Sequence, residues 1–372
     1  MTKIDPTFWL NRRVLVTGHT GFKGSYLAAW LSELGADIVG VAHPPAPPAG
    51  LFALAGLDQR LLNVTADVRD RARLEHLVVA SSPEIVFHLA AQPVVLDGLK
   101  RPLDTFDTNI QGTLNILQAA RRAPDLRAMV VVTSDKAYRP STEPRGEADH
   151  LGGIEPYSAS KACADIIAEA YRHCYLSPED GIGLATARAG NVIGGGDFAA
   201  DRLVPDLVRG IAAGRTVPIR HPDAIRPWQH VLDAVHGYLL LAEALATAPR
   251  RFARAWNFGP VQAPWPVRDV ADRLVARLGG QWAAVPMAGR HETPVLRLDP
   301  TAAIEELGWR PRLDTAAAVD WTAEGYRRLE AEASGRFVLD QIERFSDLRP
   351  VGEVAGRGRP ATGQPAEAHA HA

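Results

Sequence analysis

The chain has 372 residues, 46% hydrophobic and 23% charged, a composition typical of a globular protein with about two domains. Its formal net charge is −2, which favours a small-molecule partner over nucleic acid or a membrane surface. Two cysteines, Cys163 and Cys174, are too few for a disulfide scaffold or a cysteine-based zinc site, and no metal site is expected. We expect neither a secretory leader nor a membrane span, and therefore a cytoplasmic protein.

Arginine greatly outnumbers lysine among the basic residues. Lysine occurs at only five positions, which are Lys3, Lys23, Lys100, Lys136 and Lys161. Arg stays protonated in proteins, whereas the pKa of a Lys can be lowered until it releases its proton. We therefore expect some of these lysines to hold roles that Arg cannot fill.

Apolar runs typical of buried strands alternate with amphipathic segments in the first half of the chain. The predicted strands are 13–17, 37–41, 61–65, 85–89, 129–133 and 183–187. Helical spacing occurs at 24–34 and 105–120, and a proline-rich loop at 43–48 follows the second strand. This alternation predicts an α/β fold with a doubly wound parallel sheet.

A glycine-rich turn joins the first predicted strand to its helix. The spacing GxxGxxG is a variant of the dinucleotide fingerprint, in which glycines let a pyrophosphate approach the helix N-terminus closely. We expect this turn to bind the cofactor through Gly18, Thr20, Gly21, Phe22, Lys23 and Gly24. The Lys23 side chain either contacts a phosphate or remains solvated.

Residues after the third and fourth strands agree with a dinucleotide site. Asp67, followed by Val68, could accept a hydrogen bond from an adenine amino group or could cap a helix starting near residue 69. The fourth strand ends in Leu89, Ala90 and Ala91, which leave room for a cofactor. The second strand lacks the acidic residue that binds the ribose, so this rule leaves NAD and NADP open.

Two short motifs contain candidate acid and base groups. Tyr157 and Lys161 are four residues apart, on one face of a predicted helix, where the ammonium would lower the phenol pKa. Ser134, Asp135 and Lys136 follow the fifth strand, at the sheet edge where catalytic groups gather. Separately the motifs could be a surface pair and a solvated turn. Together they indicate a catalytic site.

Beyond about residue 190 the pattern changes to Gly- and Pro-rich segments with short predicted helices, at 204–213 and 267–278. A predicted helix at 230–245 is expected to return to the first domain. The expected parts are a Rossmann-like dinucleotide domain (1–189 plus about 230–255), a smaller discontinuous substrate domain (190–229 plus 256–350) and a disordered tail (351–372). Three tryptophans, Trp228, Trp256 and Trp309, are expected in the core.

The motifs in chain order resemble the extended short-chain dehydrogenase/reductase superfamily, and within it the CDP-glucose 4,6-dehydratase family. The resemblance covers residues 11–329 and rests on GHTGFKG, HLAAQP, TSDK, YSASK, AGNVIGGGD, HPDAIRPWQHVLD, WNFGP and LGWRPR. It implies an NAD-dependent lyase that forms CDP-4-keto-6-deoxyglucose without net redox. It also implies a homodimer.

The resemblance implies a role for each residue of the two motifs. Tyr157 would deprotonate the glucose 4-hydroxyl, with Lys161 as its electrostatic partner and Ser134 holding the oxygen. Lys136 would remove the C5 proton and Asp135 would protonate the departing 6-hydroxyl. The charge of Asp135 favours a protonated Lys136, so burial has to offset this effect.

Further contacts follow from the same resemblance. Thr108 is expected beside the cofactor. The expected substrate-binding residues, besides Ser134, are Gln92, Asn191, Arg202 and Arg226. Arg suits phosphate because its planar guanidinium offers several donors at once.

The chain departs from the family pattern after the fourth strand. The segment 95–99 (VLDGL) replaces one with a cation, a hydroxyl and an aromatic residue, while Ala159 and Phe198 stand where Asn and Trp are common. These changes bear on the nucleotide and sugar bound. The rival interpretations are a sugar-nucleotide 4-epimerase or decarboxylase, and a catalytically silent dinucleotide-binding scaffold.

Overall fold

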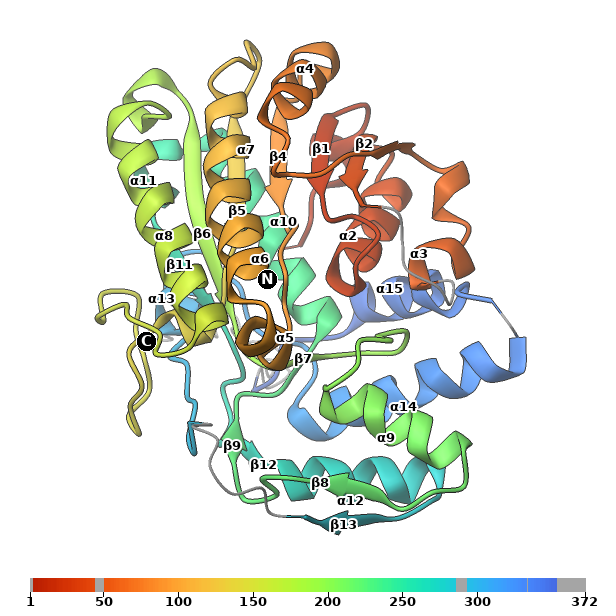
Figure 1. Cartoon of the computed structure of the whole chain (residues 1–372). Helices are drawn as coiled ribbons and strands as arrows, with labels where there is room; N and C mark the ends of the chain where they lie inside the picture. The colour runs from red at the N-terminus through yellow and green to blue at the C-terminus, as the bar shows by residue number, and fades with distance from the viewer. Residues whose placement is uncertain (1–2, 44–49, 286–292, 333, 353–372) are drawn as a thin grey trace, which may run out of the picture.

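A seven-stranded parallel sheet forms the centre of the computed structural model, which describes residues 3–43, 50–285, 293–332 and 334–352 (Figure 1). The strand order is β11-β6-β5-β4-β1-β2-β3. The strands are β1 (Arg13–Thr17), β2 (Asp37–Ala42), β3 (Leu62–Thr65), β4 (Ile85–His88), β5 (Ala128–Val132), β6 (Gly183–Ala189) and β11 (Ala255–Phe258). The predicted α/β class and doubly wound parallel sheet are confirmed.

Helices cover both faces of this sheet. The helices of one layer are α4 (Arg71–Ser81), α7 (Gly112–Ala120) and α8 (Pro156–Cys174), and those of the other include α2 (Phe22–Glu33) and α10 (Val231–Thr247). Successive side chains of a strand point to opposite faces. Leu15 therefore packs with the α4, α7 and α8 layer, whereas its neighbour Val16 packs with α2 and α10.

The remaining elements are short or lie away from the central sheet, where α9, α12, β8 and β13 occupy the lower end of the molecule in Figure 1. The other helices are α1 (Pro6–Trp9), α3 (Leu51–Leu54), α5 (Val95–Lys100), α6 (Pro102–Phe106), α9 (Leu203–Ala212), α11 (Pro249–Phe252), α12 (Val267–Leu278), α13 (Thr301–Glu305), α14 (Thr315–Glu332) and α15 (Phe337–Asp347). The small strands are β7 (Val192–Ile193), β8 (Val217–Ile219), β9 (Ile225–Arg226), β10 (Gln229–His230), β12 (Trp265–Pro266) and β13 (Trp282–Ala284). None of the described helices is long and apolar enough to cross a bilayer.

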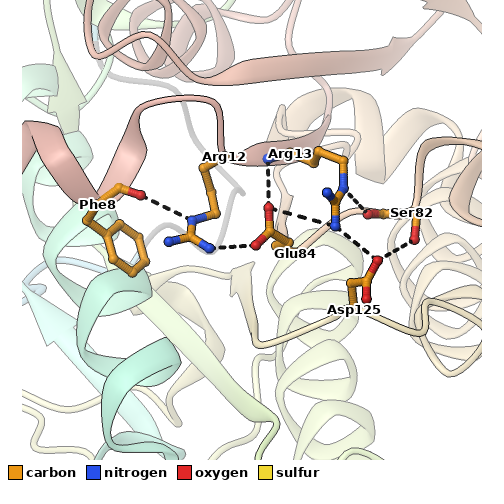
Figure 2. A network of polar contacts seen from close by, with 6 residues as sticks. All are labelled: Phe8, Arg12, Arg13, Ser82, Glu84 and Asp125. Atoms are coloured by element: carbon orange, nitrogen blue, oxygen red, sulfur yellow. Dashed lines mark hydrogen bonds and ion pairs between the residues drawn. The ribbon is translucent and has the colours of Figure 1, made fainter.

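Charged side chains tie together the amino ends of β1, β4 and β5, as Figure 2 shows. The Glu84 carboxylate accepts hydrogen bonds from Arg12 Nη1 at 2.5 Å and from the backbone N–H of Arg13 at 3.2 Å. Arg13 also reaches Asp125 at 2.9 Å. This network fixes the strand starts, and it leaves the opposite, carboxyl edge of the sheet for the candidate site.

Three local predictions need correction. The third strand is an exposed edge strand and not a buried one, with Leu62 63% exposed. The predicted helix at 105–120 is interrupted by a π-helical turn, Asp107–Gln111, between α6 and α7. Asp70, and not Asp67, caps α4 by accepting the N–H of Arg73.

The tryptophan prediction is confirmed. Trp228 is 4% exposed, and Trp256 and Trp309 are completely buried. Most of the proline-rich loop, residues 44–49, and most of the predicted tail, residues 353–372, lie outside the described residues.

Candidate active site

The glycine turn after β1 forms a close backbone cradle. Gly18 has φ +75° and packs so tightly on the end of β4 that an added Cβ would lie 2.6 Å from the amide nitrogen of Ala90. A Cβ on Gly24 would collide with the carbonyl oxygen of Gly18. No side chain caps α2 at Gly21, so its first N–H groups remain available to an anion. The turn thus fits the pyrophosphate of a dinucleotide.

This close packing gives a direct test of the cradle. Gly24→Ala is expected to reduce NAD affinity by at least tenfold, because the loop must shift to relieve the clash with Gly18. Gly146→Ala is the matched control, since its added Cβ would meet nothing within 4 Å. Calorimetric titration with NAD measures the affinity, and thermal unfolding separates it from a loss of fold. Unchanged NAD affinity in Gly24→Ala would contradict the assignment.

Asp67 lies near the start of α4, beside His43. Its carboxylate accepts the Arg69 N–H at 2.8 Å and forms an ion pair with His43 at 3.0 Å. Burial acts to raise the pKa of Asp67, but the Arg69 hydrogen bonds and the His43 charge lower it overall. The adenine contact of Asp67 remains a prediction. Val68 beside it is buried, and Asn115 donates to its carbonyl oxygen at 3.0 Å.

The segment after β4 is held by hydrogen bonds of its own. Gln92 donates from its side-chain amide to the Val94 carbonyl and to Thr105, both at 3.0 Å. Its backbone N–H donates to Asn109 Oδ1 at 2.7 Å. The Gln92 side chain is therefore occupied within the loop, and its substrate contact remains a prediction. Thr108, expected beside the cofactor, lies half-buried in the π-helical turn.

Ser134, Asp135 and Lys136 form a tight turn at the end of β5. Ser134 Oγ donates to Asp135 Oδ1 at 3.0 Å and accepts the Lys136 N–H at 3.2 Å. Asp135 is buried and its Oδ2 has no hydrogen-bond partner among the described residues. Burial raises the pKa of this carboxyl group, although the Lys136 charge and the Ser134 hydrogen bond oppose the rise. A buried carboxyl group with a free oxygen can hold a proton for transfer.

Tyr157 and Lys161 lie on α8, as predicted. Glu155 caps the helix by accepting the Tyr157 and Ser158 N–H groups at 2.8 and 2.9 Å. Lys161 Nζ donates to the Val132 carbonyl at 3.1 Å, and burial lowers its pKa to about 8. Burial raises the pKa of Tyr157, and a side-chain hydrogen bond with Ser134, in the turn after β5, partly opposes this rise. The two predicted motifs therefore meet at one place.

Lys23 is half-buried. Burial, together with the nearby charges of Lys161 and Arg202, lowers its pKa to about 7, whereas Asp135 and Asp197 oppose this shift. The glycine turn consequently lies beside the Ser134 and Tyr157 motifs. The phosphate contact of Lys23 stays a prediction.

Two arginines border the same region. Arg202 forms an ion pair with buried Asp197 at 2.9 Å, and its charge opposes the rise of the Tyr157 pKa. Arg226 is buried, donates to the Ile225 carbonyl at 2.8 Å, and its charge acts on Asp135. Asn191 accepts the Gln229 N–H through its backbone oxygen at 3.1 Å.

Sequence reasoning missed several residues that hold this site together. Asn109, in the π-helical turn, donates from Nδ2 to Ser160 Oγ on α8 at 2.8 Å and to the Gln92 carbonyl at 3.0 Å, which links the segment after β4 to the Tyr157 helix. Its signal was the run of polar residues from Asp107 to Asn109 inside the predicted helix. Asp197 and Glu155 were also missed, although each lies within five residues of a predicted site residue.

The parallel sheet, the glycine cradle and the Tyr157–Lys161 helix together define a dinucleotide-binding protein of the extended short-chain dehydrogenase/reductase type. The chain belongs to the NAD dependent epimerase/dehydratase family, whose model matches residues 14–259. The family that the motifs predicted is thereby confirmed.

Relatives with known names agree with this assignment. The chain is 41% identical over 318 residues to CDP-glucose 4,6-dehydratase of Salmonella typhimurium, covering 83% of this chain and 89% of the relative. It is 30% identical to dTDP-glucose 4,6-dehydratase of Streptomyces antibioticus, covering 84% and 92%. A solved dTDP-glucose 4,6-dehydratase from Streptomyces venezuelae, with NAD and TYD bound, superposes with TM-score 0.74 at 26% identity, covering 86% and 98%. NAD is therefore confirmed as the cofactor.

Proposed function

We propose that this protein is a nucleotide-sugar 4,6-dehydratase that converts CDP-glucose to CDP-4-keto-6-deoxyglucose. The observation that carries the proposal is the turn of Ser134, Asp135 and Lys136 beside the Tyr157 helix. Bound NAD would accept a hydride from the sugar and return it, so the reaction has no net redox. The 41% identical relative that bears this name supports the same conclusion.

Oxidation at C4 requires a base and a charge that stabilises it. Tyr157 is the base, since a phenolate can take the 4-hydroxyl proton as the hydride leaves the carbon. Burial alone would keep Tyr157 protonated, so the Lys161 ammonium on the next helical turn is needed to favour the phenolate. Ser134, hydrogen-bonded to Tyr157, holds the oxygen at C4 of the sugar.

Elimination of water uses the turn after β5. The 4-ketone acidifies the C5 hydrogen, Lys136 takes that proton, and Asp135 gives its own proton to the departing 6-hydroxyl. Burial raises the Asp135 pKa, which favours the proton-donating role of this carboxyl group.

The diphosphate and nucleotide are assigned to the segments beyond β6. We propose that Arg226, Arg202 and Asn191 contact them, with Gln92 on the sugar side, and that residues 190–229 plus 256–350 form the substrate domain. The burial of Arg226 beside Asp135 supports this placement. The adenine and pyrophosphate of NAD are assigned to Asp67, Val68 and the glycine turn, within residues 1–189 plus about 230–255.

The proposal is tested with a panel of CDP-, dTDP-, GDP- and UDP-glucose. We expect a 4-keto-6-deoxy sugar product, identified by mass, with CDP-glucose giving the highest kcat/KM. Conversion to a C4 epimer would favour the epimerase alternative. NAD binding without conversion of any of the four would favour the silent scaffold.

The pH dependence follows from Lys161. Its pKa is lowered to about 8, so the ammonium that stabilises the phenolate is present below about pH 8 and is lost above it. We expect kcat/KM to fall as the pH rises through this value. Initial rates between pH 6 and 10, at saturating NAD, measure it. A kcat/KM that continues to rise up to pH 10 would contradict the role of Lys161.

We further propose a homodimer that acts in the cytoplasm. Both cysteines are free, which fits a reducing compartment. Exposed apolar side chains on adjacent helices support the dimer: Ile166 on α8 is 54% exposed and Leu103 on α6 is 75% exposed.

A charge on this surface should separate the subunits. Ile166→Arg is expected to halve the mass measured by light scattering, because a buried unpaired guanidinium is costly in an apolar interface. Leu62→Arg, on the exposed edge strand β3, is the control and should leave the mass unchanged. If Ile166→Arg has the same mass as the unmodified protein, this surface does not form the dimer.

A further inference from the structure

One buried arginine touches several segments of the candidate site. Arg188, on β6, is 4% exposed, and Asp165, on α8, is 3% exposed. The pair is bidentate: Nε donates to Oδ2 at 3.2 Å and Nη2 donates to Oδ1 at 3.0 Å. Asp165 lies four residues after Lys161, one helical turn along the same helix. The ion pair therefore fixes α8 against the sheet next to the proposed Tyr157–Lys161 pair.

The remaining nitrogen of the guanidinium, Nη1, contacts the segment that follows Lys136. Arg188 Nη1 donates to Tyr138 Oη at 2.6 Å and to the Glu147 carbonyl at 3.1 Å, and the guanidinium lies 4.7 Å from the centre of the Tyr138 ring. Tyr138 Oη donates onward to Asn257 Oδ1 on β11 at 2.8 Å. Tyr138 is therefore held from two strands.

The backbone around Tyr138 continues directly into the catalytic turn. Its N–H donates to the Asp135 carbonyl at 3.3 Å, and the Gly152 N–H donates to the Ala137 carbonyl at 2.9 Å. Residues 138–152 thus leave the turn and return to the start of α8. A displacement of Tyr138 would move the turn that contains Lys136 relative to the helix that contains Tyr157.

We propose that Asp165, Arg188 and Tyr138 are positioning residues that set the placement of Lys136 relative to Tyr157 and Lys161. The inference rests on the proposed dehydratase function, and it assigns these residues to different half-reactions. The ion pair acts on the helix used for oxidation, and the Tyr138 hydroxyl acts on the turn used for elimination. A buried ion pair that served stability alone would have no reason to affect one half-reaction more than the other.

Tyr138→Phe separates the two halves, since it keeps the ring under the guanidinium and removes both hydroxyl hydrogen bonds. In the first half, the C4–H hydride would pass to bound NAD and the hydroxyl proton to Tyr157. In the second half, the C5 proton would pass to Lys136 and the 6-hydroxyl would leave as water with the Asp135 proton. The hydride would then return to C6 while a proton from Lys136 or solvent returns to C5. Slowing only the second half leaves nicotinamide in its reduced form.

The experiment follows the NAD-loaded protein with CDP-glucose in a stopped-flow instrument. In Tyr138→Phe the rate of nicotinamide reduction is expected to stay within threefold of that of the unmodified protein. Product should form at least tenfold more slowly, so reduced nicotinamide should accumulate. Tyr171→Phe is the matched control. It removes one hydroxyl bond from α8, to Gln118 at 3.1 Å, away from the turn, and should leave both rates unchanged. Normal product formation in Tyr138→Phe, or an equal slowing of both halves, overturns the proposal.

A second measurement does not depend on turnover. Competitive acetylation of the unliganded protein, read by mass spectrometry, reports the environment of half-buried Lys136 against that of buried Lys161. In Tyr138→Phe the labelling ratio of Lys136 to Lys161 should change at least twofold, and in Tyr171→Phe it should not. An unchanged ratio overturns the positioning role. Failure of the unmodified protein to convert any nucleotide-glucose would instead overturn the proposed function.

Discussion

Lys136→Arg should bind NAD and CDP-glucose normally, yet form product about 10²- to 10⁴-fold more slowly, which is the range attributed to a positioned general base. Arg keeps the positive charge but stays protonated, so it cannot remove the C5 proton. Oxidation at C4 should still occur, because Tyr157 and Lys161 are on a different element.

The signature of this variant is therefore a stable rise in the absorbance of reduced nicotinamide after CDP-glucose is added. Lys100→Arg is the control, since Lys100 is exposed at the end of α5. That control should form product at the normal rate. Normal dehydration by Lys136→Arg would show that the base is another residue, and that the rarity of lysine carried no functional signal.

Tyr157→Phe should block the reaction one step earlier. Without the phenol no group accepts the 4-hydroxyl proton, so hydride transfer is expected to slow about 10²- to 10⁴-fold, with no accumulation of reduced nicotinamide. The variant should remain folded, since the ring that packs at the start of α8 is kept and the cap by Glu155 uses backbone N–H groups.

Single-turnover measurements distinguish this variant from Lys136→Arg. The two substitutions slow the same overall reaction, but only the lysine variant should accumulate reduced nicotinamide. If Tyr157→Phe also accumulates it, proton removal at C4 is assigned to the wrong residue. Calorimetric titration with NAD checks that the loss does not come from weaker cofactor binding.

The central sheet could be predicted from sequence because buried parallel strands are nearly continuous apolar runs between helices. This pattern is the same for a central strand and for an edge strand, so it did not reveal that β3 is exposed. The π-helical turn at Asp107–Gln111 was missed because one extra residue scarcely changes hydrophobic spacing over a long helical segment. Helix caps are equally local: Asp67 and Asp70 are both suitable residues, and only the backbone selects Asp70.

Most of the candidate site could be predicted because parallel strands bring their carboxyl ends to one edge. This rule predicts that the glycine turn and the turn after β5 lie at the same edge of the sheet. The direction of a long side chain is set by its packing, however. Sequence therefore left Lys23 either at a phosphate or in solvent, and only the structure places it beside Lys161 and Arg202. The Arg188 network was missed because its members lie far apart in the chain.

The most direct test of the proposed chemistry is an NMR analysis of the product formed from CDP-glucose in D₂O. A dehydratase that uses Lys136 at C5 and internal hydride return must give a 4-keto-6-deoxy sugar with one solvent deuterium at C5, none from solvent at C6, and no net reduction of NAD. Recovery of the C4 epimer without deuterium at C5 would contradict the account. So would product formation that consumes NAD stoichiometrically.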